Sequence, residues 1–384
     1  MIPAYAPPHT IHELLKATHD LLTYKNVKEE FEHIIKEYLQ TDRYLTTGSG
    51  RRALYIALKS LGIGKGDEVI LPAFTSDIVP MVIREAGATP IPADVGLGDY
   101  NIDTGSVLDR ISNKTKALLT VHSFGYPSDL KTLKEICDDH NLFLIEDLAP
   151  AFGAKYNGKP VGTFGDLGIT SFGIGKSISM GDGGGIIVQN EELFKQIKDD
   201  IQKENKNSGN TFIKVFGSII MSNPQLYGIV GYRVKDIMVS KQYDHYLDEI
   251  IDKQDISLLS YAIGIQEMKS DVLEKRRKIA LEYTKVLNKF DDVYPPVETR
   301  DVCSAYSRYF VRVESEEIRN NILKRMKTMG IEPLIPYHGY PISTSLYPST
   351  FCDMIPKAIL LSKTLIGIPV YTRIPENKIK ELFL

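Results

Sequence analysis

The sequence lacks the features that attach proteins to membranes or to nucleic acids. No window of the 384-residue chain reaches the ~18 consecutive apolar residues that a membrane-spanning helix requires. No basic segment precedes an apolar run at the start, MIPAYAPPHTIHELL, so we expect no signal peptide. The formal net charge is −3 and the isoelectric point is about 6.3, which gives no electrostatic reason to expect nucleic acid or an anionic membrane as a general partner.

Cysteine is scarce as well. The chain has three cysteines, Cys137, Cys303 and Cys352, which are far apart and show no metal-ligand spacing. An odd number of scattered cysteines argues against a disulfide framework and favours a reducing compartment, which we expect to be the cytoplasm.

What the chain does have is a regular alternation of apolar runs and amphipathic segments. Strand patterns cover residues 68–71, 89–95, 117–121, 142–146 and 167–172, and helix patterns lie between them at 77–86, 103–110 and 130–140. Strands that alternate with helices of this length predict an α/β fold with a mostly parallel sheet covered on both faces. Apolar residues at helical spacing also predict one or two helices within 11–39 and one long helix over 256–287.

The same patterns divide the chain into three parts. Residues 1–40 form an arm and helices, residues 41–270 a large domain, and residues 271–384 a smaller C-terminal α+β domain. Within the large domain, residues 200–250 diverge into a polar stretch and then an apolar, aromatic one, 212–232. The apolar surface of that stretch needs cover, for which we consider a partner subunit first, a lipid-like part of a substrate second and a membrane surface last.

Lys176 has an unusual position in this pattern. It lies between the apolar run 167–172 and a glycine-rich turn, 181–185, that leads into a second apolar run, 186–188. A lysine held between two core elements is partly desolvated, which lowers its pKa and lets its amine form a Schiff base. Taken alone, a loop lysine is more often a solvated surface residue.

An acidic pair, Glu146 and Asp147, ends the apolar strand 142–146. Open parallel sheets bind their ligands at the carboxyl ends of the strands, so Asp147 could face a cofactor. The alternative is that Asp147 caps a helix that follows the strand.

A glycine-containing turn, Thr47-Gly48-Ser49-Gly50, precedes a further helix pattern. The backbone N–H groups of Gly50, Arg51 and Arg52 would point into a site at the positive end of this helix, where a phosphate binds well. The alternative is a solvated helix start, although two arginines are unfavourable there without an anion.

The same turn fits the dinucleotide fingerprint Gly-x-Gly-x-x-Ala, which would indicate a nicotinamide-dependent oxidoreductase. That reading needs a clear strand before the turn and an acidic residue at the end of the next strand. The preceding segment, DRYLTT, is short and polar, and the next strand ends in Pro72-Ala73-Phe74. The fingerprint therefore lacks its expected context.

Together these segments resemble the DegT-type aminotransferases, which are fold type I enzymes that use pyridoxal 5′-phosphate (PLP) to aminate keto-sugars attached to nucleotides. The family pattern is matched, in order and spacing, by Glu146-Asp147, Gly153, Gly162-Thr163-Phe164-Gly165-Asp166, Ser171-Phe172, Lys176 and Gly181-Asp182-Gly183-Gly184. The resemblance covers nearly the whole chain and is weakest at 200–255. It implies a fold type I PLP transferase, with a mostly parallel large-domain sheet, that acts as a homodimer.

The resemblance also implies roles for individual residues. Lys176 would hold PLP and carry a proton during the transfer, and Asp147 would keep the ring nitrogen of PLP protonated. The cofactor phosphate would be bound by Ser49, Gly50, Arg51 and Ser171.

Three more residues match positions near the substrate. Tyr337 and His338 follow a strand in the small domain, which reaches over the substrate in this family. His122 lies in VHSFGYP, which resembles the family's Val-His-x-x-Gly-x-Pro. A histidine after a buried strand is more often a structural residue, so both roles remain open for His122.

Three positions depart from the family pattern. Ser76 stands where an aromatic ring usually stacks on PLP, and Phe74 is the nearby ring that could replace it. Pro150 replaces a glutamine that donates to the cofactor ring. Lys253 replaces an asparagine that the neighbouring subunit gives to the phosphate, and a lysine can also pair with phosphate. These departures indicate a divergent branch of the family.

The sequence therefore predicts a PLP-dependent aminotransferase in surface-polysaccharide or amino-sugar biosynthesis. Its donor is an amino acid, glutamate by family implication, and its acceptor is a keto-sugar linked to a nucleotide. The alternatives are an NAD(P)-dependent oxidoreductase and a catalytically silent fold type I relative. Retention of Lys176, Asp147 and Ser171 together argues against a silent relative, because a binding module needs no Schiff-base lysine.

Overall fold

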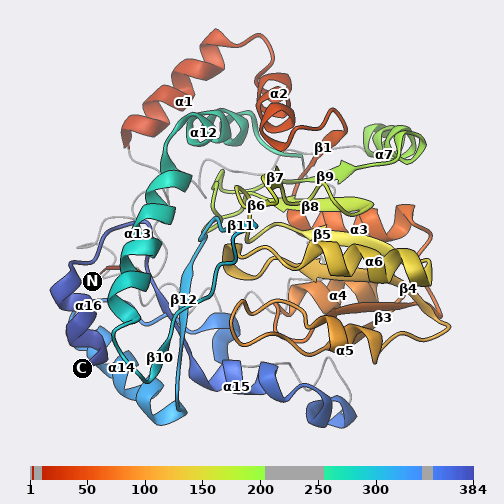
Figure 1. The fold of residues 1–384 in the computed structure, drawn as a ribbon. Helices are drawn as coiled ribbons and strands as arrows, with labels where there is room; N and C mark the ends of the chain where they lie inside the picture. Colours follow the sequence, from red (N-terminus) through yellow and green to blue (C-terminus); the bar gives the residue numbers. More distant parts are fainter. Residues whose placement is uncertain (1, 4–10, 204–254, 340–348) are drawn as a thin grey trace.

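The fold is organised around a seven-stranded sheet with the strand order β1-β9-β8-β5-β4-β2-β3 (Figure 1). The computed structural model describes residues 2–3, 11–203, 255–339 and 349–384. The strands of this sheet are β1 (Tyr44–Thr47), β2 (Glu68–Pro72), β3 (Thr89–Ala93), β4 (Thr115–Val121), β5 (Phe143–Asp147), β8 (Leu167–Ser171) and β9 (Gly184–Val188). Pairing is parallel from β3 through β2, β4 and β5 to β8, whereas β9 is antiparallel to both β8 and β1. The predicted mostly parallel sheet is confirmed.

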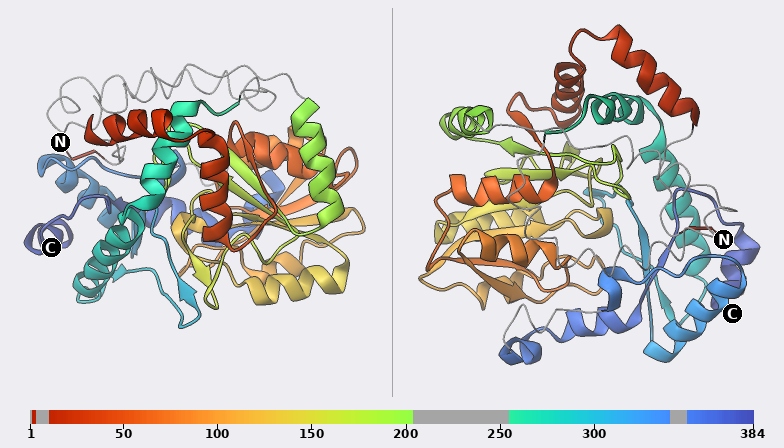
Figure 2. Two further views of the ribbon diagram at one scale, coloured as in Figure 1. Left: turned by 90° about the horizontal axis from the view of Figure 1, so that it is seen from above. Right: turned by 180° about the vertical axis from the view of Figure 1, so that it is seen from behind.

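Side-chain alternation along the strands creates two apolar cores. Val69 and Leu71 of β2 pack on one face of the sheet, whereas Ile70 packs on the other. The first face is covered by α3 (Gly50–Ser60), α4 (Ile78–Glu85) and α7 (Glu191–Lys203), and the second by α5 (Thr104–Leu108) and α6 (Leu130–His140). Helices α5 and α6 lie in front of the sheet in Figure 1, and the view from behind brings α3 to the front (Figure 2).

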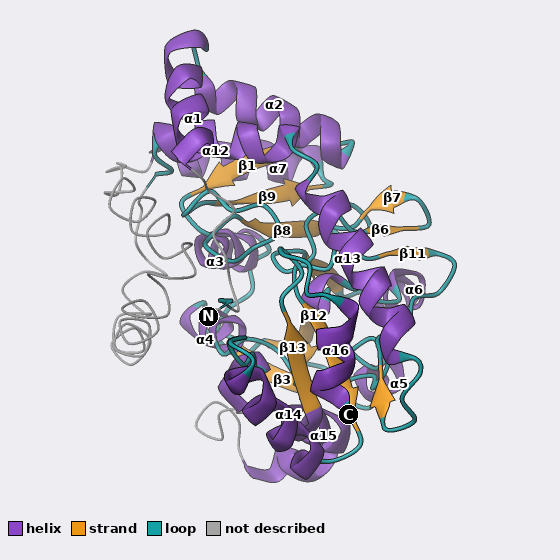
Figure 3. Ribbon diagram, turned by 90° about the vertical axis from the view of Figure 1, so that its left-hand side faces the viewer, coloured by secondary structure: helices purple, strands orange, loops and turns teal. Residues whose placement is uncertain are grey.

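Two helices that precede the large sheet in sequence and one that follows it form a layer beyond the β1 edge of the sheet (Figure 3). These helices are α1 (Ile11–Thr23), α2 (Val27–Leu39) and α12 (Leu258–Lys269). Phe31 of α2 packs 5.6 Å from the ring of Tyr261 in α12 and 5.5 Å from the ring of Phe172, which follows β8. The layer is therefore packed directly against the segment that carries Lys176. The expectation of one or two helices within residues 11–39 is confirmed, and there are two.

The expected single helix over 256–287 is wrong, because the chain breaks at Ser270. Helix α12 ends at Lys269, and α13 (Val272–Leu287) starts in a new direction (Figure 1). The Ser270 hydroxyl donates to the carbonyl of Glu267 at 2.7 Å and accepts from the Val272 N–H at 3.3 Å. Such local bonds between a serine and the backbone compete with helix continuation. None of the helices in the described ranges is long and apolar enough to cross a membrane.

A separate, smaller sheet forms the C-terminal part. Its antiparallel strands are β10 (Val293–Tyr294), β12 (Tyr309–Val313) and β13 (Leu365–Ile368), and its helices are α13, α14 (Glu316–Thr328), α15 (Pro356–Thr364) and α16 (Glu376–Phe383). Ile2 bridges to Ile331 here, since the Ile2 N–H donates to Gly330 and the Ile2 carbonyl accepts from Glu332. A third small sheet joins β11 (Val302–Cys303) to β6 (Lys155–Tyr156) and β7 (Lys159–Pro160). The exact residue limits of the three predicted domains stay predictions.

A side chain from the large sheet caps a helix of the C-terminal part and so links the two. The carboxylate of Asp94, just after β3, accepts hydrogen bonds from the backbone N–H groups of Lys357 at 3.1 Å and Ala358 at 2.9 Å. Both groups belong to the first turn of α15, whose own cap residue, Ile355, makes no side-chain capping bond. Asp94 therefore supplies the missing cap from the other side of the contact.

Candidate active site

Lys176 lies in a tight loop at the end of β8. Its N–H donates to the carbonyl of Gly173 at 3.2 Å, which closes a turn. The N–H of Phe172 donates to Gly183 at 2.9 Å, and the N–H of Met180 donates back to Phe172 at 2.8 Å. These bonds fold the predicted glycine-rich turn back onto the strand end. Gly183 has φ +104°, a conformation that residues with side chains rarely adopt.

The surroundings of Lys176 lower the pKa of its amine. The side chain is half-buried, and desolvation lowers its pKa from 10.5 to about 8. The Asp147 carboxylate opposes this shift, whereas Arg308 and Arg51 add to it by charge repulsion. One anion and two cations therefore act on the Lys176 amine.

Asp147 is the last residue of β5 and is buried. Its Oδ1 accepts from the N–H of Ala149 at 2.9 Å, and its main-chain carbonyl accepts from the N–H of His122 at 3.1 Å. Burial raises the pKa of the carboxyl above its ordinary value, and the nearby Lys176 partly offsets this. Asp147 does not cap a helix, because none lies between β5 and β6 in this fully described stretch. Its side chain caps only the turn that follows β5.

The start of α3 and the end of β8 meet beside this pair. Ser49 caps α3 by accepting from the N–H of Arg52 at 3.2 Å, so Gly50 and Arg51 form the positive end of the helix. A Cβ built on Gly50 would lie 2.7 Å from the Cβ of Ser171 and 3.1 Å from its hydroxyl oxygen. Backbone donors of a helix N-terminus and the Ser171 hydroxyl are therefore gathered at one place, as a phosphate requires.

These residues fit PLP. Because residue 50 has no side chain, its backbone N–H lies next to the Ser171 hydroxyl, and these two donors together suit a phosphate. The buried carboxylate of Asp147 suits a protonated ring nitrogen, and the desolvated amine of Lys176 suits a Schiff base.

Two of the three positions that depart from the family pattern, Ser76 and Pro150, follow the carboxyl ends of strands of the large sheet. Ser76 is half-buried in the turn between β2 and α4, and Pro150 is half-buried in the turn after β5. Phe74 has no exposed surface, and its ring packs edge-on against Phe124 at 6.3 Å and Tyr337 at 5.1 Å. Phe74 would have to leave the core to stack on a cofactor, so the structure does not support it as the replacement ring.

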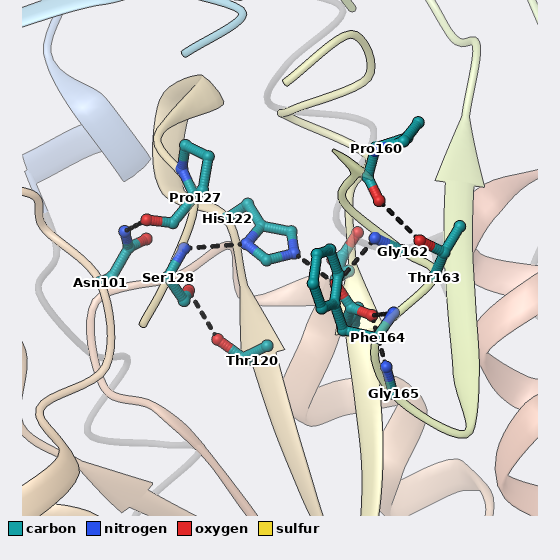
Figure 4. A network of polar contacts seen from close by, with 12 residues as sticks. Asn101, Thr120, His122, Pro127, Ser128, Pro160, Gly162, Thr163, Phe164 and Gly165 are labelled. Atoms are coloured by element: carbon teal, nitrogen blue, oxygen red, sulfur yellow. Dashed lines mark hydrogen bonds and ion pairs between the residues drawn. The ribbon is translucent and has the colours of Figure 1, made fainter. Parts of the chain in front are cut away.

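His122 has no exposed surface, and both nitrogens of its ring are bonded inside the protein (Figure 4). Nδ1 accepts from the N–H of Ser128 at 3.1 Å, and Nε2 lies 3.1 Å from Oε2 of Glu146. The predicted substrate contact of His122 is therefore corrected in favour of the structural alternative.

Tyr337 lies in the 3₁₀ turn η4 (Pro336–Gly339) and is half-buried. Its ring stacks on that of Phe124 at 5.6 Å, and both residues have positive φ, +51° and +55°. Strained backbone of this kind is held in place by surrounding packing, and here the strained residues meet between the sheet edge and the C-terminal part. The His338 side chain, Lys253 and residues 212–232 lie outside the described part of the chain.

Arg308 is a site residue that the sequence did not indicate. It immediately precedes β12, and the segment before it packs on Gly125, whose Cβ would lie 2.5 Å from the Tyr306 nitrogen. The N–H of Ala305 donates to the Gly125 carbonyl at 2.9 Å. These contacts bring a small-domain arginine to the loop that follows β4. A single arginine in YSRYF gives no sequence signal for this.

The nicotinamide alternative fails on one of the two grounds found in the sequence, since β2 ends at Pro72 without an acidic residue, and on a further ground that the sheet order adds. A strand, β1, does precede the glycine-containing turn, so the expectation that none is there was wrong. However, β1 lies at one edge of the sheet beside β9, whereas β2 lies between β4 and β3. A dinucleotide fingerprint requires the two strands that flank its helix to belong to one βαβ unit of neighbouring parallel strands.

Residues 9–383 match the DegT/DnrJ/EryC1/StrS aminotransferase family. The chain belongs to this family. It is 30% identical over 359 residues to a GDP-perosamine synthase of Escherichia coli O157:H7, covering 90% of this chain and 88% of that protein. It is 28% identical over 349 residues to a dTDP-3-amino-3,4,6-trideoxy-alpha-D-glucose transaminase of Streptomyces venezuelae, covering 89% and 81%.

A solved structure supports the fold. The aminotransferase TlmJ from Streptoalloteichus hindustanus superposes with a TM-score of 0.77 at 21% identity, covering 100% of this chain and 97% of that one. The fold type I architecture expected from the sequence is thereby confirmed, as is the resemblance to the DegT-type enzymes.

Proposed function

We propose that this protein is a PLP-dependent aminotransferase that transfers an amino group from an amino acid to a keto-sugar carried by a nucleotide. The observation that carries the proposal is the amine of Lys176, which has a pKa of about 8 and lies within electrostatic reach of the buried Asp147 carboxylate. The helix start at Gly50 and the hydroxyl of Ser171 provide a phosphate site at the same sheet edge.

Each residue has a defined task in this reaction. Ser171 and the backbone of Gly50 and Arg51 bind the phosphate and orient the cofactor. Asp147 holds the proton on the ring nitrogen, and the Nζ amine of Lys176 moves a proton from the α-carbon of the amino donor. When bound, PLP supplies the electron sink that stabilises negative charge at that carbon.

The proposed substrates follow the chemistry of the relatives. The two relatives above are named for amino sugars carried by GDP and dTDP, which supports a nucleotide-linked keto-sugar as acceptor. We propose glutamate as donor, and surface-polysaccharide or amino-sugar biosynthesis as the setting. We also propose a cytoplasmic homodimer, in which Lys253 of each subunit reaches the phosphate in its neighbour and the segment 212–232 is covered by the partner subunit.

A spectroscopic experiment tests the cofactor and its anchor. The purified protein is mixed with PLP, its visible absorption is recorded, borohydride is added, and the labelled peptide is identified by mass spectrometry. We expect a yellow band that bleaches on reduction, with the pyridoxyl group on Lys176, and a K176A variant without the band. An adduct on a different lysine, or no band, would contradict the proposal.

The substrates are tested on the loaded enzyme. Addition of glutamate should shift the band to that of the pyridoxamine form, and a nucleotide-linked keto-sugar should restore it. Ping-pong kinetics should result, because the amino group stays bound to the enzyme between the two half-reactions. If an unlinked keto-sugar restores the band as fast as the nucleotide-linked one, the nucleotide plays no part in recognition.

A further inference from the structure

Glu146 is a buried carboxylate whose acceptor positions are all filled by groups of the protein itself. Its Oε1 accepts from the N–H groups of Phe164 at 2.7 Å and Gly165 at 2.6 Å. Its Oε2 accepts from the N–H of Gly162 at 2.7 Å and lies 3.1 Å from Nε2 of His122. A carboxylate has about four acceptor positions, and all of them are used here. Glu146 therefore has no lone pair left for a substrate or a cofactor.

The hydrogen bonds of His122 determine its protonation. Nδ1 accepts from the backbone N–H of Ser128, so it carries no proton, and Nε2 must be the N–H that donates to Glu146. His122 is therefore a neutral donor. Ser128 is fixed in turn, because its side chain lies 2.8 Å from the hydroxyl of Thr120 in β4.

The pair connects segments that are far apart in sequence. Glu146 holds the turn 162–165, which leads into β8 and on to Ser171 and Lys176. His122 holds the loop 122–128, which contacts the segment before Arg308 through Gly125. In Figure 4, Pro127 and Ser128 of the loop lie on one side of the His122 ring, and Gly162 to Gly165 of the turn lie on the other.

Asp147 lies directly next to this pair but on the other side of the sheet. Neighbouring side chains in a strand point to opposite faces, so Glu146 and Asp147 of β5 do so as well. The backbone N–H of His122 also donates to the carbonyl of Asp147 at 3.1 Å. The main chain of Asp147 is therefore held by two contacts: the fixed side chain of the preceding residue, Glu146, and the hydrogen bond from His122 in the loop after β4.

We infer that Glu146 and His122 are positioning residues, which act from the far face of the sheet to fix the Asp147 carboxylate relative to the Lys176 amine. Neither contacts substrate. The inference deepens the proposed function, and it rests on that function for its catalytic meaning. Its physical content, the spacing of Asp147 and Lys176, is measurable without cofactor or substrate.

The experiment uses the full chain without cofactor and reads the pKa of Lys176. The rate at which 1-fluoro-2,4-dinitrobenzene modifies Lys176 is measured against pH, with the Lys176 peptide quantified by mass spectrometry. The groups that act on this amine are Asp147, Arg51 and Arg308. The D147N variant gives the pKa of Lys176 without its carboxylate partner, which should be lower than that of the wild type.

Two variants then perturb the pair. H122N changes no net charge, since His122 is neutral. E146Q replaces one acceptor oxygen with an NH2 donor, so the amide cannot accept from all the N–H groups that face this side chain. Both should move the pKa of Lys176 toward the D147N value and raise its modification rate several-fold near neutral pH. In the D147N background neither should cause a further shift, because the carboxylate they position is absent.

A matched control lies in the same turn. The hydroxyl of Thr163 donates to the carbonyl of Pro160 at 2.8 Å and has no bond to Glu146 among those of the described residues. T163A should therefore lower the melting temperature without changing the pKa of Lys176.

Three outcomes would overturn the inference. In the first, H122N and E146Q have lower melting temperatures but the same pKa of Lys176 as the wild type, which would show that the pair has only a structural role. Another is an equal shift by E146Q with and without Asp147, which would be a direct charge effect. The third applies if E146Q does not fold: the test then depends on H122N alone, and an unchanged pKa of Lys176 in that variant would refute the inference. A failed PLP experiment with the pKa coupling intact would refute the proposed function and leave the positioning in place.

Discussion

Gly50 and Ser171 are in such close contact that the first residue of α3 has no room for a side chain. A Cβ on residue 50 would lie 2.7 Å from the Cβ of Ser171, well inside normal contact. Because this contact forms the proposed phosphate site, it should be sensitive to one added methyl group.

We expect G50A to weaken PLP binding by about 10-fold or more, given the ~1–3 kcal/mol that overpacking costs. A spectrophotometric titration with PLP measures this. G64A is the control, because a Cβ there comes no closer than 3.7 Å to its neighbours. Equal PLP affinity of G50A and the wild type would show that the phosphate binds elsewhere.

The lowered pKa of Lys176 predicts the pH dependence of its reactivity. The neutral amine is the reactive form, and its fraction rises with pH through the folded-state pKa of about 8, compared with 10.5 for an ordinary lysine. The modification rate of Lys176 in the cofactor-free protein should therefore reach half its maximum near pH 8. A midpoint near 10.5 would mean that the site does not desolvate the amine.

Arg308 should contribute to this lowered pKa. Its positive charge disfavours the protonated amine of Lys176, so R308M should raise the pKa of Lys176 and slow its modification at neutral pH. R312M is the control, since Arg312 lies on the same strand region but stacks on the ring of Tyr294 at 3.8 Å. If both variants shift the pKa of Lys176 equally, the cause is a change in the structure around β12 and not the loss of the Arg308 charge.

Asp94 should stabilise the contact between the large sheet and the C-terminal part. D94N keeps the size of the side chain but places an amide against two N–H donors of α15, so we expect a loss of about 1–2 kcal/mol in the free energy of unfolding. Urea denaturation measures this. D353N removes an exposed negative charge just before the same helix and should have little effect. A similar loss in D353N would point to the helix dipole instead of the cap.

The candidate site could be predicted wherever its residues belong to consecutive segments. Asp147 and Ser171 end two strands that are neighbours in the sheet, and Lys176 follows within one loop. Local spacing therefore determined their proximity. The glycine-containing turn at Gly50 was also visible, because a helix start has its own sequence signal.

Other features depended on tertiary contacts that sequence patterns do not contain. Arg308 reaches the site because Gly125 lets the segment before it pack closely, and this involves residues more than 170 positions apart. β1 is polar in sequence, yet it is a strand because β9 pairs with it. The break at Ser270 came from a serine that bonds to nearby backbone, a local signal that the surrounding apolar periodicity concealed.

The bridge between Ile2 and Ile331 has a consequence for the order in which the chain folds during synthesis. At a rate of ~5–20 residues per second, roughly 15–65 s separate the translation of these two residues. The central sheet, whose last strand ends at Val188, has all its strands well before then. Ile2 can therefore form this bridge only after Ile331 has emerged from the ribosome, long after every strand of the central sheet has been translated.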